Sequence, residues 1–208
     1  IYNEEESLPV LHAEITAALE SMGEETNAEV IYVDDCSRDG SLRVMLGMRA
    51  DDPRVRIVKF RRNFGQTAAM AAGFDQARGE VVVTLDGDLQ NDPADIPMLV
   101  RELEQGYDIV AGWRKKRHDG FVLRLLPSRI ANRLIAVVTG VPIHDTGCTL
   151  KAFRRKLVKS MSIYADHHRF LPVMSAGTGA KITELVVNHR ARRFGESKYG
   201  IGRATRVL

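Results

Sequence analysis

The chain has 208 residues, of which 44% are hydrophobic and 27% are charged, and its formal net charge is +3. This length and composition are typical of one folded globular domain, and the small net charge excludes a chain-wide polyelectrolyte. Asp and Glu nevertheless prevail up to about Asp108, whereas Arg and Lys cluster from Arg114 onward. This asymmetry predicts a basic working face in the second half, directed at phosphate or an anionic surface.

The two cysteines, Cys36 and Cys148, lack a Cys-x-x-Cys spacing. They argue against a zinc site or a disulfide framework and fit a reducing compartment. No run approaches the ~20 apolar residues of a membrane span, and we expect no signal peptide within these residues. Because the chain opens at Ile1 without Met and closes at Leu208 in mid-pattern, we interpret it as a fragment. This interpretation leaves open whether membrane segments lie beyond either end.

Apolar residues at spacings of three and four predict an amphipathic helix over residues 8–22. Short apolar runs then alternate with helical stretches, which predicts strands over 30–33, 55–60, 81–85 and 108–111 and helices over 37–49, 65–77 and 93–105. This alternation with short connections indicates a mostly parallel, doubly wound sheet with helices on both faces.

The alternation ends near residue 112. Residues 113–120 predict a basic loop, and 121–139 a long helix that Pro127 kinks or divides. Two further strands are expected over 149–153 and 182–187, followed by a basic tail over 189–202. We therefore predict a single α/β domain over residues 1–208.

The expected strand over residues 81–85 ends in two carboxylates. Asp86 and Asp88 flank Gly87, and Gln90 follows. An unbroken Val- and Leu-rich run predicts a strand buried on both faces, and ligands bind at the carboxyl ends of such strands. Two carboxylates and an amide oxygen suit Mg²⁺ or Mn²⁺, whose other ligands are usually substrate phosphates. The alternative is a strand-end turn in which an Asp caps the next element.

A second carboxylate pair, Asp34 and Asp35, ends the expected strand over 30–33. An Asp at this sheet edge can accept hydrogen bonds from a nucleobase or a ribose, and Asp34 is the better candidate. The alternative is helix capping by Asp35 or Ser37. Neither a Gly-x-Gly-x-x-Gly motif nor a P-loop is present, so we expect a metal rather than a glycine loop to neutralise a bound diphosphate.

Five segments occur together in register: Tyr-Asn-Glu-Glu at 2–5, Val-Asp-Asp-Cys-Ser-Arg-Asp-Gly at 33–40, Arg-Asn-Phe-Gly-Gln at 62–66, Leu-Asp-Gly-Asp-Leu-Gln-Asn-Asp-Pro at 85–93 and Asp-Thr-Gly-Cys at 145–148. In this arrangement the chain resembles family 2 glycosyltransferases of the GT-A fold, and among them the polyprenyl-phosphate glycosyltransferases. The resemblance covers nearly the whole chain, although the family's first strand and its Pro would lie ahead of Ile1.

The resemblance implies that residues 1–112 bind a nucleoside-diphosphate (NDP) sugar of the UDP-glucose or GDP-mannose type. The implied donor residues are Tyr2, Glu4 and Asp34 for the nucleoside, Asn63, Phe64 and Gly65 for the lining, and Asp86, Asp88 and Gln90 for the metal and diphosphate. Gln66 stands where many members carry a Lys, so a positive charge is absent there.

The same resemblance implies that residues 113–208 bind a dolichyl or undecaprenyl phosphate. Its phosphate would be held by Arg114, Arg124 and Ser128, and the alternative for these residues is a solvated basic face. Asp145 would be a catalytic base or, because a phosphate acceptor is already ionised, an orienting residue. The tail at 192–199 resembles the family's Arg-x-x-Gly-x-Ser-Lys-Tyr segment, so that a lid over the diphosphate would comprise Arg192, Ser197 and Lys198.

The implied activity is inverting, metal-dependent transfer in cell-envelope glycan synthesis at the cytoplasmic face of a membrane. Asp88, Asp145, Arg114 and Lys198 would carry the chemistry. The alternatives are a polysaccharide or glycolipid acceptor, or a non-catalytic module that binds nucleotide-sugar or lipid. We expect no nucleic-acid partner, since basic and aromatic residues are little interleaved, and a homo-oligomer is left open.

Overall fold

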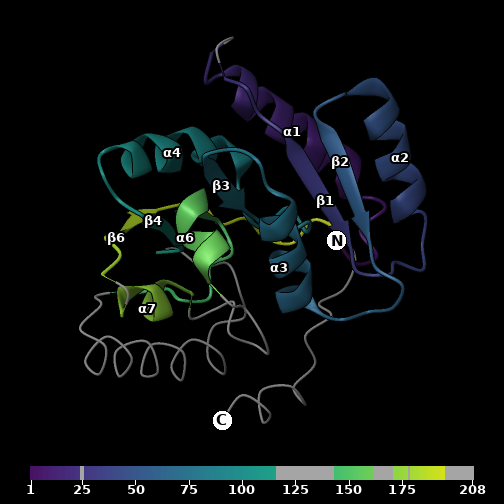
Figure 1. Cartoon of the computed structure of the whole chain (residues 1–208). Coiled ribbons are helices and arrows are strands. Elements are labelled where there is room, and N and C mark those ends of the chain that lie inside the picture. The colour runs from purple at the N-terminus through teal and green to yellow at the C-terminus, as the bar shows by residue number, and fades with distance from the viewer. Residues whose placement is uncertain (24–25, 116–142, 162–170, 178, 195–208) are drawn as a thin grey trace.

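The computed structural model describes residues 1–23, 26–115, 143–161, 171–177 and 179–194. Helices and strands alternate through most of this part of the chain, as Figure 1 shows. The elements are α1 (Leu8–Glu20), β1 (Val30–Asp34), α2 (Ser41–Asp51), β2 (Val55–Lys59), α3 (Gln66–Gln76), β3 (Val81–Thr84), the 3₁₀ turn η1 (Pro93–Asp95), α4 (Ile96–Glu104), β4 (Ile109–Trp113), β5 (Lys151–Arg154), α6 (Arg155–Ser160), α7 (Leu171–Ala176) and β6 (Ile182–Val186).

The described strands form two hydrogen-bonded groups. β1 and β2 pair in parallel, whereas the other four have the order β3-β5-β4-β6. β4 and β6 are parallel, but β5 runs antiparallel to both β3 and β4. The expected α/β fold is confirmed, with a more mixed sheet than the alternation pattern predicted, because β5 from the second half of the chain separates β3 from β4.

The direction of β5 determines where the site forms. Lys151, its first residue, lies opposite both Thr84, the last residue of β3, and Ala111 of β4. Because β5 is antiparallel, the residues just before it lie at the carboxyl ends of β3 and β4. The Asp145 turn is therefore brought to the edge of the sheet where the β3 carboxylates are.

Helices cover the strands from several directions (Figure 1). α2 packs on β2, α3 packs on β1 and α6, and α4 packs on β4 and β5. α1 contacts α2 as well as η1 and α4, so it joins the part of the core around β1 and β2 to the part around β3 to β6.

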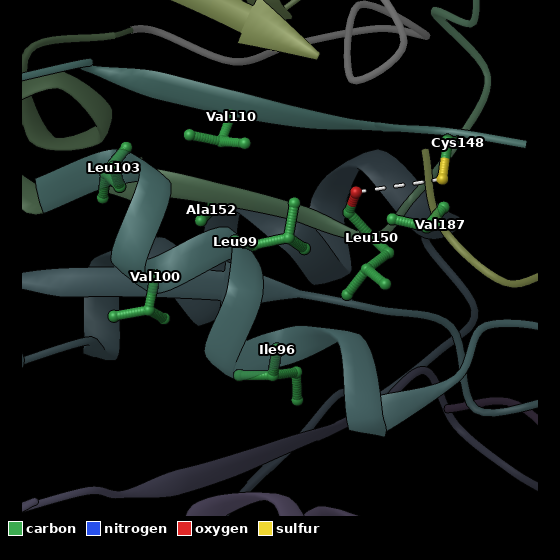
Figure 2. Packing of buried hydrophobic residues seen from close by; sticks show 9 residues of the cluster. All are labelled: Ile96, Leu99, Val100, Leu103, Val110, Cys148, Leu150, Ala152 and Val187. Atoms are coloured by element: carbon green, nitrogen blue, oxygen red, sulfur yellow. Dashed lines mark hydrogen bonds between the residues drawn. The ribbon is translucent and has the colours of Figure 1, made fainter. Parts of the chain in front are cut away.

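The apolar stripe of α4 forms the centre of one core cluster, shown in Figure 2. Its four members recur at the i, i+3, i+4, i+7 spacing of a helix that buries one face. They face side chains from the sheet and its flanks, and the complete cluster is Ile96, Leu99, Val100, Leu103, Val110, Cys148, Leu150, Ala152 and Val187. This packing anchors the strands whose carboxyl ends carry the candidate site.

β3 was expected to be buried on both faces. Val81 and Val83 pack against the α4 cluster, whereas Val82 packs against a different cluster that includes Phe74 and Phe153. Both faces of β3 are thus covered, but all four of its residues keep partial exposure, so complete burial was wrong.

Several predicted boundaries shift. The helix expected over 37–49 begins at Ser41, because residues 37–40 form a turn tied to the N-terminal segment, and the helix expected over 93–105 is divided into η1 and α4. α6 was not predicted, and the helix expected over 121–139 lies outside the described residues. Among the described residues, no helix has the length and apolar character needed to cross a membrane.

Candidate active site

The turn after β3 carries the predicted metal-binding residues. Leu89 adopts φ +63° while almost fully buried, a conformation that costs of order 1–3 kcal/mol in a residue other than Gly. Gly87 leaves room for Ile1, since a Cβ at Gly87 would lie 2.6 Å from Ile1 Cδ1. The backbone N–H of Gln90 donates to Asp88 Oδ1 at 3.1 Å, which closes the turn.

Asp86 is partly exposed and is held by Gln66, whose Nε2 donates to Asp86 Oδ1 at 2.7 Å. Although the residue as a whole is partly exposed, loss of water around its carboxyl group raises the pKa of Asp86, as does the nearby charge of Asp88, against smaller opposing contributions from Thr149, the Ile1 amino group and Arg114. Gln66 thus supplies a neutral hydrogen-bond donor to this carboxylate. Two neighbouring carboxylates with a neutral donor form a site that favours a cation.

Asp88 is paired with a cation from the C-terminal segment. Arg192 Nη2 donates to Asp88 Oδ2 at 2.6 Å, and Arg192 Nη1 lies 3.8 Å from Glu4 Oε1. Nη1 is buried and has no hydrogen-bond partner among the described residues. Of the three predicted lid residues, Arg192 is therefore brought to the carboxylates, whereas Ser197 and Lys198 lie outside the described residues.

The end of β1 carries the candidate nucleoside residue. Asp34 is fully buried; its Oδ1 accepts the Ser37 amide at 3.0 Å, and its Oδ2 has no hydrogen-bond partner in the described part of the chain. A buried carboxylate oxygen without a donor is costly unless a ligand or water supplies one. The alternative of helix capping by Asp35 or Ser37 is wrong, because α2 begins at Ser41 and its N-cap position, Gly40, has no side-chain cap.

The N-terminal segment is tied to the turn before α2. The Glu4 amide donates to Ser41 Oγ at 2.8 Å, and Glu4 Oε2 accepts Ser7 Oγ at 2.9 Å. Asn3 Oδ1 accepts the Arg38 amide at 2.7 Å. Ile1, next to the partly buried Tyr2, bonds the end of β1: its amino group donates to the Val33 carbonyl at 2.7 Å and its carbonyl accepts the Asp35 backbone N–H at 2.8 Å. The segment therefore lies along the same edge as the end of β1.

Asp35 binds the donor-lining loop. Its two carboxylate oxygens accept the amides of Phe64 and Gly65 at 2.7 and 2.9 Å, and its carbonyl accepts Asn63 Nδ2 at 3.2 Å. Gly65 has φ +91°, which other residues rarely adopt. Asp35 therefore holds this loop in place. The side-chain amide of Asn63 donates to the protein backbone.

The Asp145 turn holds Arg114, the residue after β4. Asp145 Oδ2 accepts Arg114 Nε at 2.7 Å and the Arg114 amide at 3.2 Å, while Oδ1 accepts Nη2 at 3.0 Å. A paired fork of this kind fixes the plane of the guanidinium. Since both Asp145 oxygens face Arg114, the geometry favours an orienting role over proton abstraction. Arg124 and Ser128 lie outside the described residues.

Sequence reasoning missed three residues at this edge. Gln66 was noted only as a missing Lys, and Lys151 and Glu184 carried no motif. Lys151 is buried and donates to the carbonyls of Thr146 and Cys148; burial lowers its pKa. Glu184 accepts hydrogen bonds from the segment just before Thr146. A charged residue within an apolar strand was the available signal for both.

The described residues contain no group of three His, Cys, Asp or Glu side chains placed to hold a metal unaided. A metal here would be bound by two carboxylates and an amide oxygen, with further ligands from a substrate.

The chain matches the family model described as glycosyl transferase family 2 over residues 1–161. It belongs to glycosyl transferase family 2. It is 47% identical to the dodecaprenyl-phosphate galacturonate synthase of Rhizobium johnstonii, over the whole chain and 62% of that protein. It is 44% identical to an undecaprenyl-phosphate 4-deoxy-4-formamido-L-arabinose transferase of Pseudomonas fluorescens, over the whole chain and 60% of that protein. The chain thus spans about three fifths of these curated relatives.

Two solved structures have the same fold. Glucosyl-3-phosphoglycerate synthase from Mycobacterium tuberculosis, crystallised with Mn²⁺, UDP and phosphoglyceric acid, matches with a TM-score of 0.67 at 19% identity, over 94% of this chain and 69% of that one. A mannosyltransferase from Pyrobaculum calidifontis, crystallised with GDP-Man and Mn²⁺, matches with a TM-score of 0.65 at 19% identity, over 89% and 52%. The family and GT-A fold expected from the sequence are confirmed.

Proposed function

We propose that this domain transfers a sugar from an NDP-sugar to the phosphate of a polyprenyl phosphate, with inversion at the anomeric carbon. The observation that carries the proposal is the meeting of two charged pairs at one sheet edge, Asp88 with Arg192 and Asp145 with Arg114. Family membership and the names of the relatives, both of which specify a polyprenyl phosphate, support the acceptor class.

Asp86, Asp88 and Gln90 suit a divalent cation. Their oxygens are those that Mg²⁺ and Mn²⁺ prefer, and Asp88 Oδ2 is engaged by a cation, the Arg192 guanidinium. When bound, a divalent ion would neutralise charge on the departing diphosphate. Arg192, released from Asp88, would then be within reach of the same diphosphate. Its positive charge would pair with Asp88 before the metal binds and with the diphosphate afterwards.

The chain's own residues orient the reactants. Asp34 offers a buried acceptor oxygen to the nucleoside, and Asp35 holds the lining loop by two amides. Arg114 would bind the acceptor phosphate through its guanidinium, whose plane Asp145 fixes. Holding the phosphate in line with the donor supplies a large part of the rate enhancement, since little proton transfer is needed.

The two halves of the domain would bind different substrates. Residues 1–112 form the donor-binding half and 113–208 the acceptor-binding half of one domain. Arg124 and Ser128 would assist with the acceptor phosphate, and Ser197 and Lys198 would complete the lid. Because the acceptor is a lipid, the domain would work at the cytoplasmic face of a membrane.

A transfer assay tests the proposal. The donors are UDP-glucose, GDP-mannose and the NDP forms of galacturonate and 4-deoxy-4-formamido-L-arabinose, with a short-chain polyprenyl phosphate and Mg²⁺ or Mn²⁺. The unaltered protein is assayed beside Asp88→Ala and the control Asp51→Asn, whose residue is exposed at the end of α2. We expect metal-dependent transfer from one donor, at least 10²-fold slower in Asp88→Ala and unchanged in the control.

Transfer to a polysaccharide or a glycolipid, but not to the polyprenyl phosphate, would contradict the acceptor assignment. Binding of nucleotide diphosphates without turnover on any acceptor would contradict catalysis and favour a binding module. A product that retains the donor's anomeric configuration would contradict the inverting mechanism.

A further inference from the structure

Glu184 in β6 has a role that none of the motifs assigns. Its side chain is 7% exposed, and both of its oxygens accept hydrogen bonds from the segment before β5. Oε2 accepts the His144 amide at 2.8 Å and lies 2.9 Å from His144 Nδ1, while Oε1 accepts the Asp145 amide at 3.1 Å. Because a carboxylate only accepts, Nδ1 carries the proton. Glu184 thus holds two consecutive backbone amides of another segment.

One of the two backbone N–H groups that Glu184 holds belongs to Asp145, the residue that orients Arg114. Asp145 receives three hydrogen bonds from Arg114, from its amide, Nε and Nη2. Glu184 also lies close to Arg114 through the sheet. It is opposite Ala111 in the β4–β6 pairing, and Ala111 is three residues before Arg114. Glu184, Asp145 and Arg114 therefore form a closed loop of contacts across two neighbouring strands.

The geometry points to Glu184 as a positioning residue for Arg114. By fixing the backbone at 144–145, it fixes the Asp145 carboxylate, which in turn fixes the plane of the guanidinium. The identity of the phosphate that Arg114 meets rests on the proposed function, whereas the positioning rests on these contacts alone. A 1 Å misplacement of a positioning group can cost a large part of the rate, so a residue that touches no substrate can still control transfer.

A matched control lies just before β1, in the other group of strands. Glu29 also accepts two backbone amides, those of Arg78 and Gly79, and one cationic side chain, Arg56. It lies before β1, whereas the site lies after β1. Glu29→Gln therefore loses contacts of the same kind without touching the Asp145 turn, and it reports the cost of a purely structural carboxylate.

The experiment compares Glu184→Gln and Glu184→Ala with Glu29→Gln in two measurements. The first is the ¹⁵N–¹H signal of Arg114 Nε, assigned with Arg114→Lys, which reports the Asp145 contact without substrate. The second is KM for the polyprenyl phosphate against kcat. In Glu184→Ala we expect the Nε signal to move toward that of solvent-exposed arginines and KM to rise about tenfold, or about 1.4 kcal/mol, with a smaller change in kcat.

Glu184→Gln should fall between wild type and Glu184→Ala, because its amide keeps one oxygen that can accept a backbone N–H. An unchanged Arg114 Nε signal in Glu184→Ala would overturn the inference, as would an equal rise in KM in Glu29→Gln. If the wild type transfers nothing to polyprenyl phosphate, the proposed function fails, and the Nε signal still decides whether Glu184 positions Arg114.

Discussion

Arg192 Nη2 lies 2.6 Å from Asp88 Oδ2, although 104 residues separate them in the sequence. The pair places an internal cation on the carboxylate that we assign to a divalent metal. On that assignment, Arg192 and a metal would compete for the same oxygen, and the pair would neutralise the charge of this carboxylate until the substrates bind.

Removal of this internal cation should strengthen metal binding. In Arg192→Ala without nucleotide, we expect Mn²⁺ to bind about tenfold more tightly, which corresponds to a competing pair worth about 1.4 kcal/mol. Isothermal titration calorimetry measures the affinity. Arg190→Ala is the control, because Arg190 pairs with Glu14 and Asp92 instead. Equal or weaker Mn²⁺ binding in Arg192→Ala would show that no such competition exists.

Replacement of Arg114 by lysine should affect the acceptor more than the donor. A lysine keeps the charge but cannot form the two-point contact with Asp145, so its position is less well defined. In Arg114→Lys we expect KM for the polyprenyl phosphate to rise about tenfold, while KM for the NDP-sugar changes little. Steady-state kinetics with each substrate varied in turn would check this, and a selective rise in donor KM would contradict the assignment.

Asp52, which lies away from the site, makes the free energy of unfolding depend on pH. Hydrogen bonds from the Arg54 side chain lower the pKa of Asp52. Because the folded pKa is below the unfolded one, the stabilisation is fully present above the unfolded pKa and is lost as the pH falls through the folded pKa. Asp52→Asn should lose about 1–3 kcal/mol at pH 7.

Denaturant unfolding at several pH values measures this difference between wild type and Asp52→Asn, which should shrink below about pH 4. Asp51→Asn, at the exposed neighbouring residue, should leave the stability nearly unchanged. A deficit in Asp52→Asn that is the same at every pH would mean that the charge of Asp52 contributes nothing.

The two cysteines should differ in reactivity. Cys148 is fully buried, and burial raises the pKa of its thiol to about 11, whereas Cys36 is partly exposed. At pH 8 the native protein should therefore be alkylated at Cys36 alone, and both thiols should react in denaturant. Mass spectrometry counts the labels, and native Cys36→Ser should take none. Labelling of Cys148 as fast as Cys36 would contradict the burial.

Local patterns in the chain are enough to predict most of the elements and the ends of two strands. The apolar runs before Asp34 and Asp86 predict strands because buried strands need continuous apolar residues, and the turn after each is marked by polar residues and glycine. These signals are local, so they could be read without knowing the strand order. The resemblance in five segments added the family, which the comparisons confirmed.

The pairing of charges at the site follows from long-range packing and could not be predicted from local patterns. Asp145 meets Arg114 across 31 residues, Glu184 meets Asp145 across 39, and Arg192 meets Asp88 across 104. The first two contacts depend on β5 running antiparallel between β3 and β4, which brings the segment before it to the carboxyl edge. The third depends on the segment after β6, which pairs with the turn after β3 through Asn91 and His189. Periodicity reports which face of an element is buried, but it carries no information on which distant strand lies beside it. The physical reason is that strand order follows from packing of the whole core, not from any local pattern.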